Sequence, residues 1–186
     1  MATAKTGSFY LTATVELPAG TASGTRLQAL IDASSYVSVA NGQALAIDSV
    51  DFVYQVGTDY GNDASTMLTS SGAVSAQLVD LNPGTAFVRA DNHSLIASGA
   101  LNIDQPNNIA THTADLYPDN FANSSTANGL NDMFLVVSDA LYLTAGPDAA
   151  NTGVASVWVT ARVRCRIVTL SAKNWTAIAI QSTASQ

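Results

Sequence analysis

The chain has 186 residues, a length that fits one domain, expected to span residues 1–186. Hydrophobic residues make up 47% of the chain, but only 11% are charged, well below the roughly 25% typical of soluble globular proteins. Seven Lys and Arg residues against fourteen Asp and Glu residues give a net charge of −7. This balance argues against binding to nucleic acid through a broad basic surface, so we expect no specific nucleic-acid partner.

The acidic residues are almost all aspartates, because thirteen Asp accompany a single Glu, Glu16, and the only lysines are Lys5 and Lys173. Helical bundles use Glu and Lys freely on their outer faces, so this composition disfavours an all-α protein. No apolar run approaches the roughly 18 residues of a membrane span, and the N-terminus lacks the apolar core of a signal peptide. We therefore expect a chain that is made and assembled inside a cell.

The first expected element is a strand over residues 8–17. Apolar and polar side chains alternate there, so that Phe9 and Leu11 share one face while Tyr10 and Thr12 share the other. A period of two residues is typical of a strand with one buried face.

The next segment, residues 26–34, is ambiguous. Leu27 and Leu30 have helical spacing, so we expect either one or two helical turns or a bent strand. The dipeptide Asn41-Gly42 then predicts a reversal of the chain. The long apolar run over residues 44–56 predicts a second strand.

The middle of the chain combines short strands with two polar segments. Residues 57–66 are rich in Gly, Asp and Asn and are expected to form a loop. Residues 104–132 hold two prolines, six asparagines and few aliphatic residues, so we expect a long irregular loop, which in compact domains is often functional. The strands expected between these segments are residues 73–81, 85–89 and 94–103.

The alternating pattern resumes after residue 132 and continues to a C-terminal tail at residues 181–186. A turn is expected to begin at Gly146-Pro147-Asp148. The expected strands are residues 133–138, 141–145, 154–170 and 175–180. Eight to ten strands with at most a trace of helix predict an all-β sandwich or barrel.

The sequence shows no recognisable catalytic or metal-binding pattern, so we expect neither an enzyme nor a cofactor, and no catalytic or metal-ligating residue is predicted. Cys165 alternates with apolar residues and is expected to be a small buried hydrophobe, while His93 and His112 are expected to be polar loop residues. Oxygen ligands gather in Asp59–Asp63, but their spacing differs from that of a calcium loop, and an ordinary turn is the favoured interpretation.

One charged pattern stands out. Arg162, Arg164 and Arg166 alternate along the 154–170 strand and therefore project from the same face. Like charges so close together need acidic partners, solvent or a ligand. Three interpretations remain open: pairing with Asp side chains of neighbouring strands, contact with the acidic surface of another copy, and binding of lipid or nucleic-acid phosphate.

Two stretches carry a resemblance to a known family. They are residues 31–53, with Ser-Tyr-Val-Ser-Val-Ala-Asn-Gly at their centre, and the end pattern formed by Leu-Tyr-Leu-Thr at 141–144, Asn-Thr-Gly at 151–153 and Val-Trp-Val-Thr-Ala-Arg-Val at 157–163. The chain resembles the single jelly-roll major capsid proteins of tailless, membrane-containing icosahedral viruses of archaea and bacteria. This family has no catalytic residues to carry over.

The resemblance implies a single jelly roll of about eight strands that assembles into capsomers of an icosahedral shell, assembled in the host cytoplasm and located in the virion. Its partners would be other copies of itself, a second capsid protein and an internal lipid membrane at the inner end. Residues 104–132 would form an outer or inter-subunit loop, and the C-terminal tail would contact a neighbouring subunit.

Two alternatives remain open from the residues themselves. The chain could be a subunit of another assembly, such as a fibre, a tail or a surface layer. It could also be a jelly-roll carbohydrate-binding module, for which Tyr10 and Trp158 on outward faces are the only aromatic hints.

Overall fold

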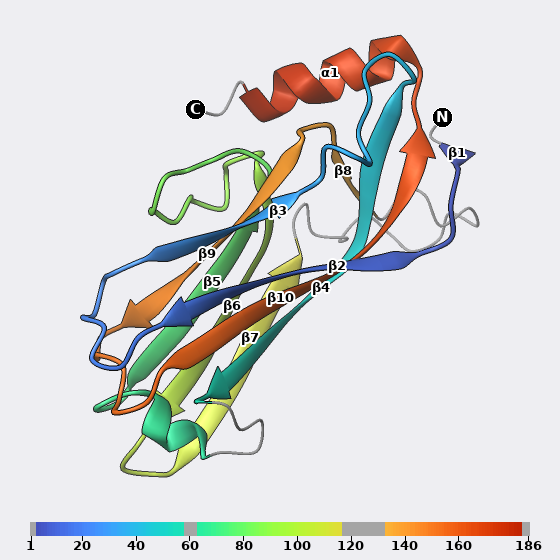
Figure 1. Cartoon of the computed structure of the whole chain (residues 1–186). Coiled ribbons are helices and arrows are strands. Elements are labelled where there is room, and N and C mark those ends of the chain that lie inside the picture. Colours follow the sequence, from blue (N-terminus) through green and yellow to red (C-terminus); the bar gives the residue numbers. More distant parts are fainter. Residues whose placement is uncertain (1–2, 58–62, 117–132, 184–186) are drawn as a thin grey trace.

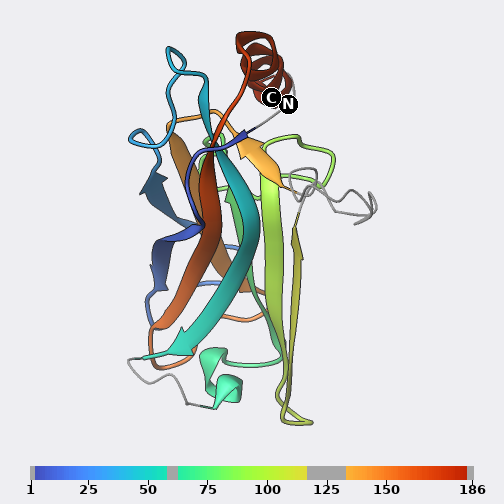
Figure 2. The same cartoon turned by 90° about the vertical axis from the view of Figure 1, so that its right-hand side faces the viewer.

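Two antiparallel five-stranded sheets face each other in the computed structural model (Figures 1 and 2). The structure describes residues 3–57, 63–116 and 133–183. Sheet A consists of β1 (Thr3–Ala4), β2 (Phe9–Leu17), β10 (Val157–Thr169), β4 (Gln43–Val56) and β8 (Phe134–Val136). Sheet B consists, in spatial order, of β3 (Leu27–Asp32), β9 (Ala140–Asp148), β5 (Gly72–Val79), β6 (Leu95–Asp104) and β7 (Ile109–Leu116). The predicted all-β sandwich is therefore confirmed.

The strands pair in a nested order. The outermost pair in the sequence is β2 with β10, followed inward by β3 with β9, β4 with β8 and β5 with β6, and all four pairs are hydrogen-bonded ladders. Ladders between β10 and β4 and between β9 and β5 then join the four pairs into two sheets. Strands that are distant in the sequence are thus adjacent at the centre of each sheet.

The core lies between the inward faces of the two sheets. Along β10, Val157, Val159, Ala161, Val163 and Cys165 are fully buried and alternate with more exposed residues. Sheet B contributes an equivalent inward row, including Val74, Leu78, Leu141 and Leu143. Burying each such Val or Leu side chain stabilises the fold by about 1.5–3 kcal/mol, so this shared core holds the sheets together.

A β-bulge in β4 shifts the alternation within sheet A. Arg164 is paired with Ser49 but Cys165 with Ile47, so Asp48 is the extra residue in the ladder. Without the bulge, Asp48 would lie opposite Cys165 on the buried face, where an ionised carboxylate is costly. The bulge thus keeps the charge outside the core while Ile47 stays within it.

The C-terminal helix α1 (Ala172–Thr183) covers one end of the outward face of sheet A (Figures 1 and 2). Trp175, Ile178 and Ala179 pack there on a small second core. Its buried members are Ala44, Ala46, Val137, Val168 and Leu170. The indole Nε1 of Trp175 also donates to the backbone oxygen of Gln43 at 3.2 Å.

The expected strand over residues 175–180 is therefore wrong, because the segment is helical, and residues 181–183 of the expected tail continue the helix. Trp175, Ile178 and Ala179 are spaced by three and four residues, which puts them on one helical face. The run Trp-Thr-Ala-Ile-Ala-Ile at residues 175–180 is also short, mostly apolar and rich in β-branched side chains, which fits a strand, so the pattern alone could not decide between the two.

Residues 109–116 form strand β7, so the expectation of an irregular segment over residues 104–132 is wrong for this part. The strand pairs with β6, yet residues 109–113 are exposed, so no buried apolar row marks them in the sequence. Residues 117–132 lie outside the described part of the chain.

Two further expectations change. Residues 85–89 form part of the loop between β5 and β6, where the backbone of Val88 bonds to the side chain of Gln77 and not to the backbone of a neighbouring strand. Gly146-Pro147-Asp148 extends β9 instead of beginning a turn. The ladder between β3 and β9 ends at Ala145, so Pro147 needs no amide hydrogen on that side.

The ambiguous segment at residues 26–34, for which either helical turns or a bent strand were expected, contains strand β3.

Candidate interaction face on sheet A

Arg162, Arg164 and Arg166 project from the outward side of β10, as the alternation predicts. The intervening Val163 and Cys165 are fully buried, while Arg162 and Arg164 are exposed and Arg166 is partly buried. The strand β10 is paired with β2 on one side and β4 on the other, so the arginines stand along the middle of the sheet face. Their surroundings nevertheless differ from one arginine to the next.

Arg166 is the member of the row that forms an ion pair. Its Nε and Nη2 atoms donate to Oδ1 of Asp48 at 3.1 and 2.6 Å. Oδ2 of Asp48 accepts from the hydroxyl of Ser8 at 3.3 Å. The residue that the bulge turns out of the core is therefore the residue that neutralises this arginine.

Arg162 stacks on an aromatic ring instead. Its guanidinium carbon lies 5.2 Å from the centroid of the Tyr10 ring, within the range of a cation–π contact. In the ladder it is opposite Thr12 of β2 and Asp51 of β4. Tyr10 itself is 53% exposed, and Arg162 is exposed as well, so the stacked pair is accessible to a partner.

Arg164 has neither arrangement. It is opposite Tyr10 of β2 and Ser49 of β4 and is exposed. Within residues 3–57, 63–116 and 133–183 its side chain makes no hydrogen bond or ion pair. The interpretation in which every arginine pairs with a neighbouring Asp thus holds for Arg166 alone among the described contacts.

The other candidate residues of the sequence are not brought together. Cys165 is buried, as predicted, and burial, followed by the nearby Asp48 carboxylate, raises the pKa of its thiol to about 12. His112 lies on β7, where its ring makes an edge contact with Tyr54 at 5.5 Å, and not in a loop. His93 is in the β5–β6 loop, as predicted. Most of the Asp59–Asp63 segment lies outside the described residues.

No cluster of three or more His, Cys, Asp or Glu side chains that could hold a metal ion occurs in the described part of the chain. Tyr10 and Trp158 face outward from neighbouring strands, but Trp158 is opposite Glu16 and Tyr10 opposite Arg164. Six residues of β10 separate the two positions, which is about 20 Å at 3.3 Å per residue. They therefore do not form one aromatic platform for a sugar.

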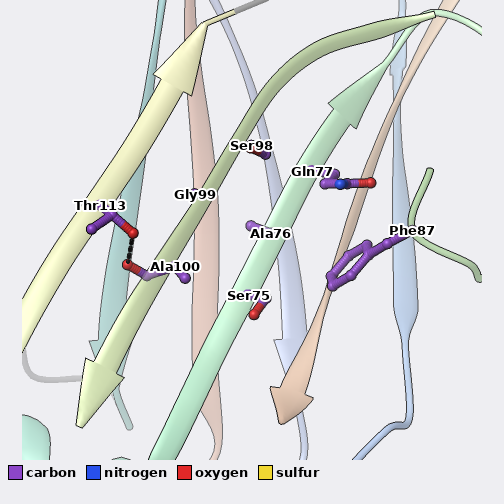
Figure 3. A pocket seen from close by; sticks show the side chains of 8 residues that line it. All are labelled: Ser75, Ala76, Gln77, Phe87, Ser98, Gly99, Ala100 and Thr113. Atoms are coloured by element: carbon purple, nitrogen blue, oxygen red, sulfur yellow. Dashed lines mark hydrogen bonds between the residues drawn. The ribbon is translucent and has the colours of Figure 1, made fainter. Parts of the chain in front are cut away.

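Sheet B has a shallow hollow of about 250 Å³ on its outward side (Figure 3). Its lining consists of Ser75, Ala76, Gln77, Phe87, Ser98, Gly99, Ala100 and Thr113. Two of the groups best suited to a ligand are already engaged. The side-chain amide of Gln77 bonds to both backbone atoms of Val88, and the guanidinium of Arg26 lies 4.4 Å from the Phe87 ring centroid. None of the lining side chains is titratable, so the hollow offers no acid or base.

One carboxylate is buried without a hydrogen-bond partner among the described residues, which the sequence analysis did not predict. Asp80, at the end of β5, is only 1% exposed, and neither of its carboxylate oxygens has a hydrogen-bond partner among the described residues. Burial raises the pKa of Asp80 to about 7. In the sequence it is simply the last residue but one of the strand expected over residues 73–81, so only the three-dimensional packing reveals its burial.

Comparison with known proteins found no protein-family model and no curated protein that matches the chain. Among the described residues, no helix has the length and apolar character needed to span a membrane. The functional interpretation therefore depends on the fold and on the surface of the chain itself.

Proposed function

We propose that the chain is a structural capsid subunit that self-assembles, through its sandwich flanks, loops and termini, into capsomers of an icosahedral virion shell. The observation that carries the proposal is the nested strand order. Pairing of β2 with β10, β3 with β9, β4 with β8 and β5 with β6 is the pattern expected when one long hairpin folds over to form a jelly roll. Jelly rolls with two facing sheets are typical of viral capsid proteins, and also of lectin domains and cupins.

In this assignment, β7 is an addition next to β6 and β1 an addition at the N-terminus. Both lie outside the four nested pairs, so the eight remaining strands constitute the jelly roll. The connection between β7 and β8 passes through residues 117–132, where the resemblance places an outer or inter-subunit loop.

The surface supports an assembly subunit over a ligand-binding module. Only 11% of the residues are charged, so much of the exterior is small, neutral and suited to burial against neighbours. The hollow on sheet B has its amide and its aromatic ring occupied by internal contacts. The outward face of sheet A, in contrast, presents Arg162 and Arg164 without an ion-pair partner among the described residues.

In this proposal the partners are other copies of the chain, a second capsid protein and an internal lipid membrane at the inner end of the subunit. The chain would be assembled in the host cytoplasm and located in the virion. Repetition of one weak interface many times stabilises such a shell through multivalency.

Negative-stain electron microscopy of the purified protein, in low and in high salt, tests the proposal. Closed rings of about six subunits, or shells, are expected, because an interface that closes on itself generates rings. Open filaments would instead identify a fibre or tail subunit, and flat lattices a surface-layer protein. Isolated particles of single-subunit size under every condition would contradict every assembly role and leave carbohydrate binding to be tested with a glycan screen.

A further inference from the structure

Basic and acidic residues are divided unequally between the two sheets. Five of the seven basic residues lie on sheet A, beside it or on the helix that covers it: Lys5, Arg162, Arg164, Arg166 and Lys173. Sheet A carries only three acidic residues, Glu16, Asp48 and Asp51, of which Asp48 is paired with Arg166. From residue 149 to the C-terminus the sequence has four basic residues and no acidic one.

Sheet B and its connections show the opposite balance. They carry Asp32, Asp91, Asp104, Asp139 and Asp148, which are all at least partly exposed, in addition to the buried Asp80. The described basic residues on this side are Arg26 and Arg89, and Arg26 is bound to Asp148. Among the described residues, one side of the sandwich therefore has an excess of basic groups and the other an excess of acidic groups.

The acidic side has an exposed corner where β3 ends and β9 begins. The backbone nitrogen of Ala33 donates to the backbone oxygen of Asp139 at 2.8 Å, and Asp32 is opposite Ala140 in the ladder. Asp32 and Asp139 are thus neighbours, and both are exposed. Neither belongs to an ion pair within the described ranges, so this corner has negative charge to offer to a partner.

We propose that the outward face of sheet A docks on the β3–β9 corner of a second copy of this chain, with Arg162 and Arg164 facing Asp32 and Asp139. This inference rests on the proposed function and names the surfaces that meet. Charge complementarity steers such contacts and suppresses wrong ones. Since the two surfaces differ, the contact is heterologous, and repetition of it generates a ring when the rotation closes.

A second copy fits this face better than a polyanion does. Glu16 and Asp51 lie on the same outward face as Arg162 and Arg164, and Asp51 is directly opposite Arg162. These carboxylates repel an extended row of lipid or nucleic-acid phosphates, whereas two localised carboxylates can meet Arg162 and Arg164 alone. The net charge of −7 adds to that repulsion.

The test uses two charge reversals and a mixture of them. Arg164→Glu changes a side chain without a described partner, and Asp139→Arg changes an exposed side chain for which no hydrogen bond is seen in the described part of the chain. Light scattering gives the protein concentration at which half of the subunits are assembled. Each variant alone should raise this concentration about tenfold or more, because it places like charges across the contact. Circular dichroism verifies that both variants are folded.

An equimolar mixture of the two variants should assemble at nearly the wild-type concentration. In a ring where the two variants alternate, the carboxylate introduced at position 164 of one copy faces the guanidinium introduced at position 139 of the next. Every other contact keeps the wild-type pair of Arg164 and Asp139. Arg89→Glu makes the same charge change in the β5–β6 loop and should assemble like wild type.

The outcomes separate this inference from the proposed function. Assembly of both variants at the wild-type concentration, or no recovery in the mixture, would overturn the proposed contact while leaving a capsid subunit possible. Failure of the wild type to assemble would overturn both. Binding of an unassembled wild type to phosphatidylglycerol vesicles, lost in Arg164→Glu, would show instead that the face binds a lipid surface.

Discussion

At the residue scale, the outward chemistry of sheet A depends on Asp48. The alternation of β4 directs this carboxylate toward the core, and the bulge turns it outward to Arg166. The side chain of Arg166 is only 27% exposed, so loss of its partner would leave a partly buried charge unpaired.

Asp48→Ala should therefore lower the free energy of unfolding by about 1–3 kcal/mol, since a partly buried charged donor loses its acceptor. Urea denaturation at neutral pH measures the change. Asp51→Ala is the matched control, because Asp51 is an exposed residue of the same strand, and an effect within about 0.5 kcal/mol is expected there. Equal destabilisation by both substitutions would contradict the special role of Asp48.

Asp80 should make the stability of the fold depend on pH. Burial raises the pKa of its carboxyl to about 7 in the folded chain, above the ordinary value of 3.8. The folded state therefore binds this proton more tightly than the unfolded state, and the stability that the group contributes below pH 4 is lost as the pH rises toward 7.

Asp80→Asn removes this titration, so the variant should exceed wild type in free energy of unfolding by roughly 2–4 kcal/mol at pH 8. The difference should shrink toward zero below about pH 3, where the wild-type carboxyl is protonated in both states. Denaturant unfolding at several pH values measures this curve, with the exposed Asp91→Asn as control. A difference that is independent of pH would show that Asp80 is not titrating as described.

At the scale of elements, the strands with a buried face could be predicted from the sequence and the exposed or covered ones could not. Buried and more exposed side chains alternate along much of β2, β4 and β10, because one side of each strand faces the core. The strand β7 lacks such alternation, and α1 buries so few side chains that its pattern also fits a strand.

The common direction of the three arginines could be predicted from the alternation along β10. The partners of these arginines could not, because they depend on the bulge in β4 and on the ladder registers, which no local sequence pattern encodes.

The helix α1 depends on its contact with sheet A, because a helix of 12 residues is marginal in isolation. Trp175→Ala removes the indole ring and its bond to Gln43, and should increase opening of α1 by roughly 30-fold, equivalent to about 2 kcal/mol. Amide hydrogen exchange over residues 172–180 measures this opening.

The rest of the sandwich should keep its protection in Trp175→Ala, because the main core lies between the sheets and does not include the helix. Thr176→Ala, at an exposed position of the same helix, serves as control and should leave exchange almost unchanged. Loss of protection throughout the chain would show that α1 is part of one cooperative unit with the sandwich.

At the scale of the whole molecule, the nested strand order and the unequal charge of the two sheets lead to the same interpretation. Under the proposed function, the nested ladders are interpreted as those of a jelly roll, a fold that capsids use repeatedly. The cationic face of sheet A and the acidic side of sheet B give one copy two complementary surfaces. In the proposed ring, each copy would bring both surfaces into contact with its neighbours.

The mass of the protein in solution tests this account most directly. Light scattering coupled to size-exclusion chromatography, over a range of protein and salt concentrations, should give particles several times heavier than the 19.2 kDa chain. Their fraction should rise with protein concentration and fall with added salt, because the proposed contact is between opposite charges. A mass of one chain at every concentration and every ionic strength would contradict the proposal that this protein is an assembly subunit.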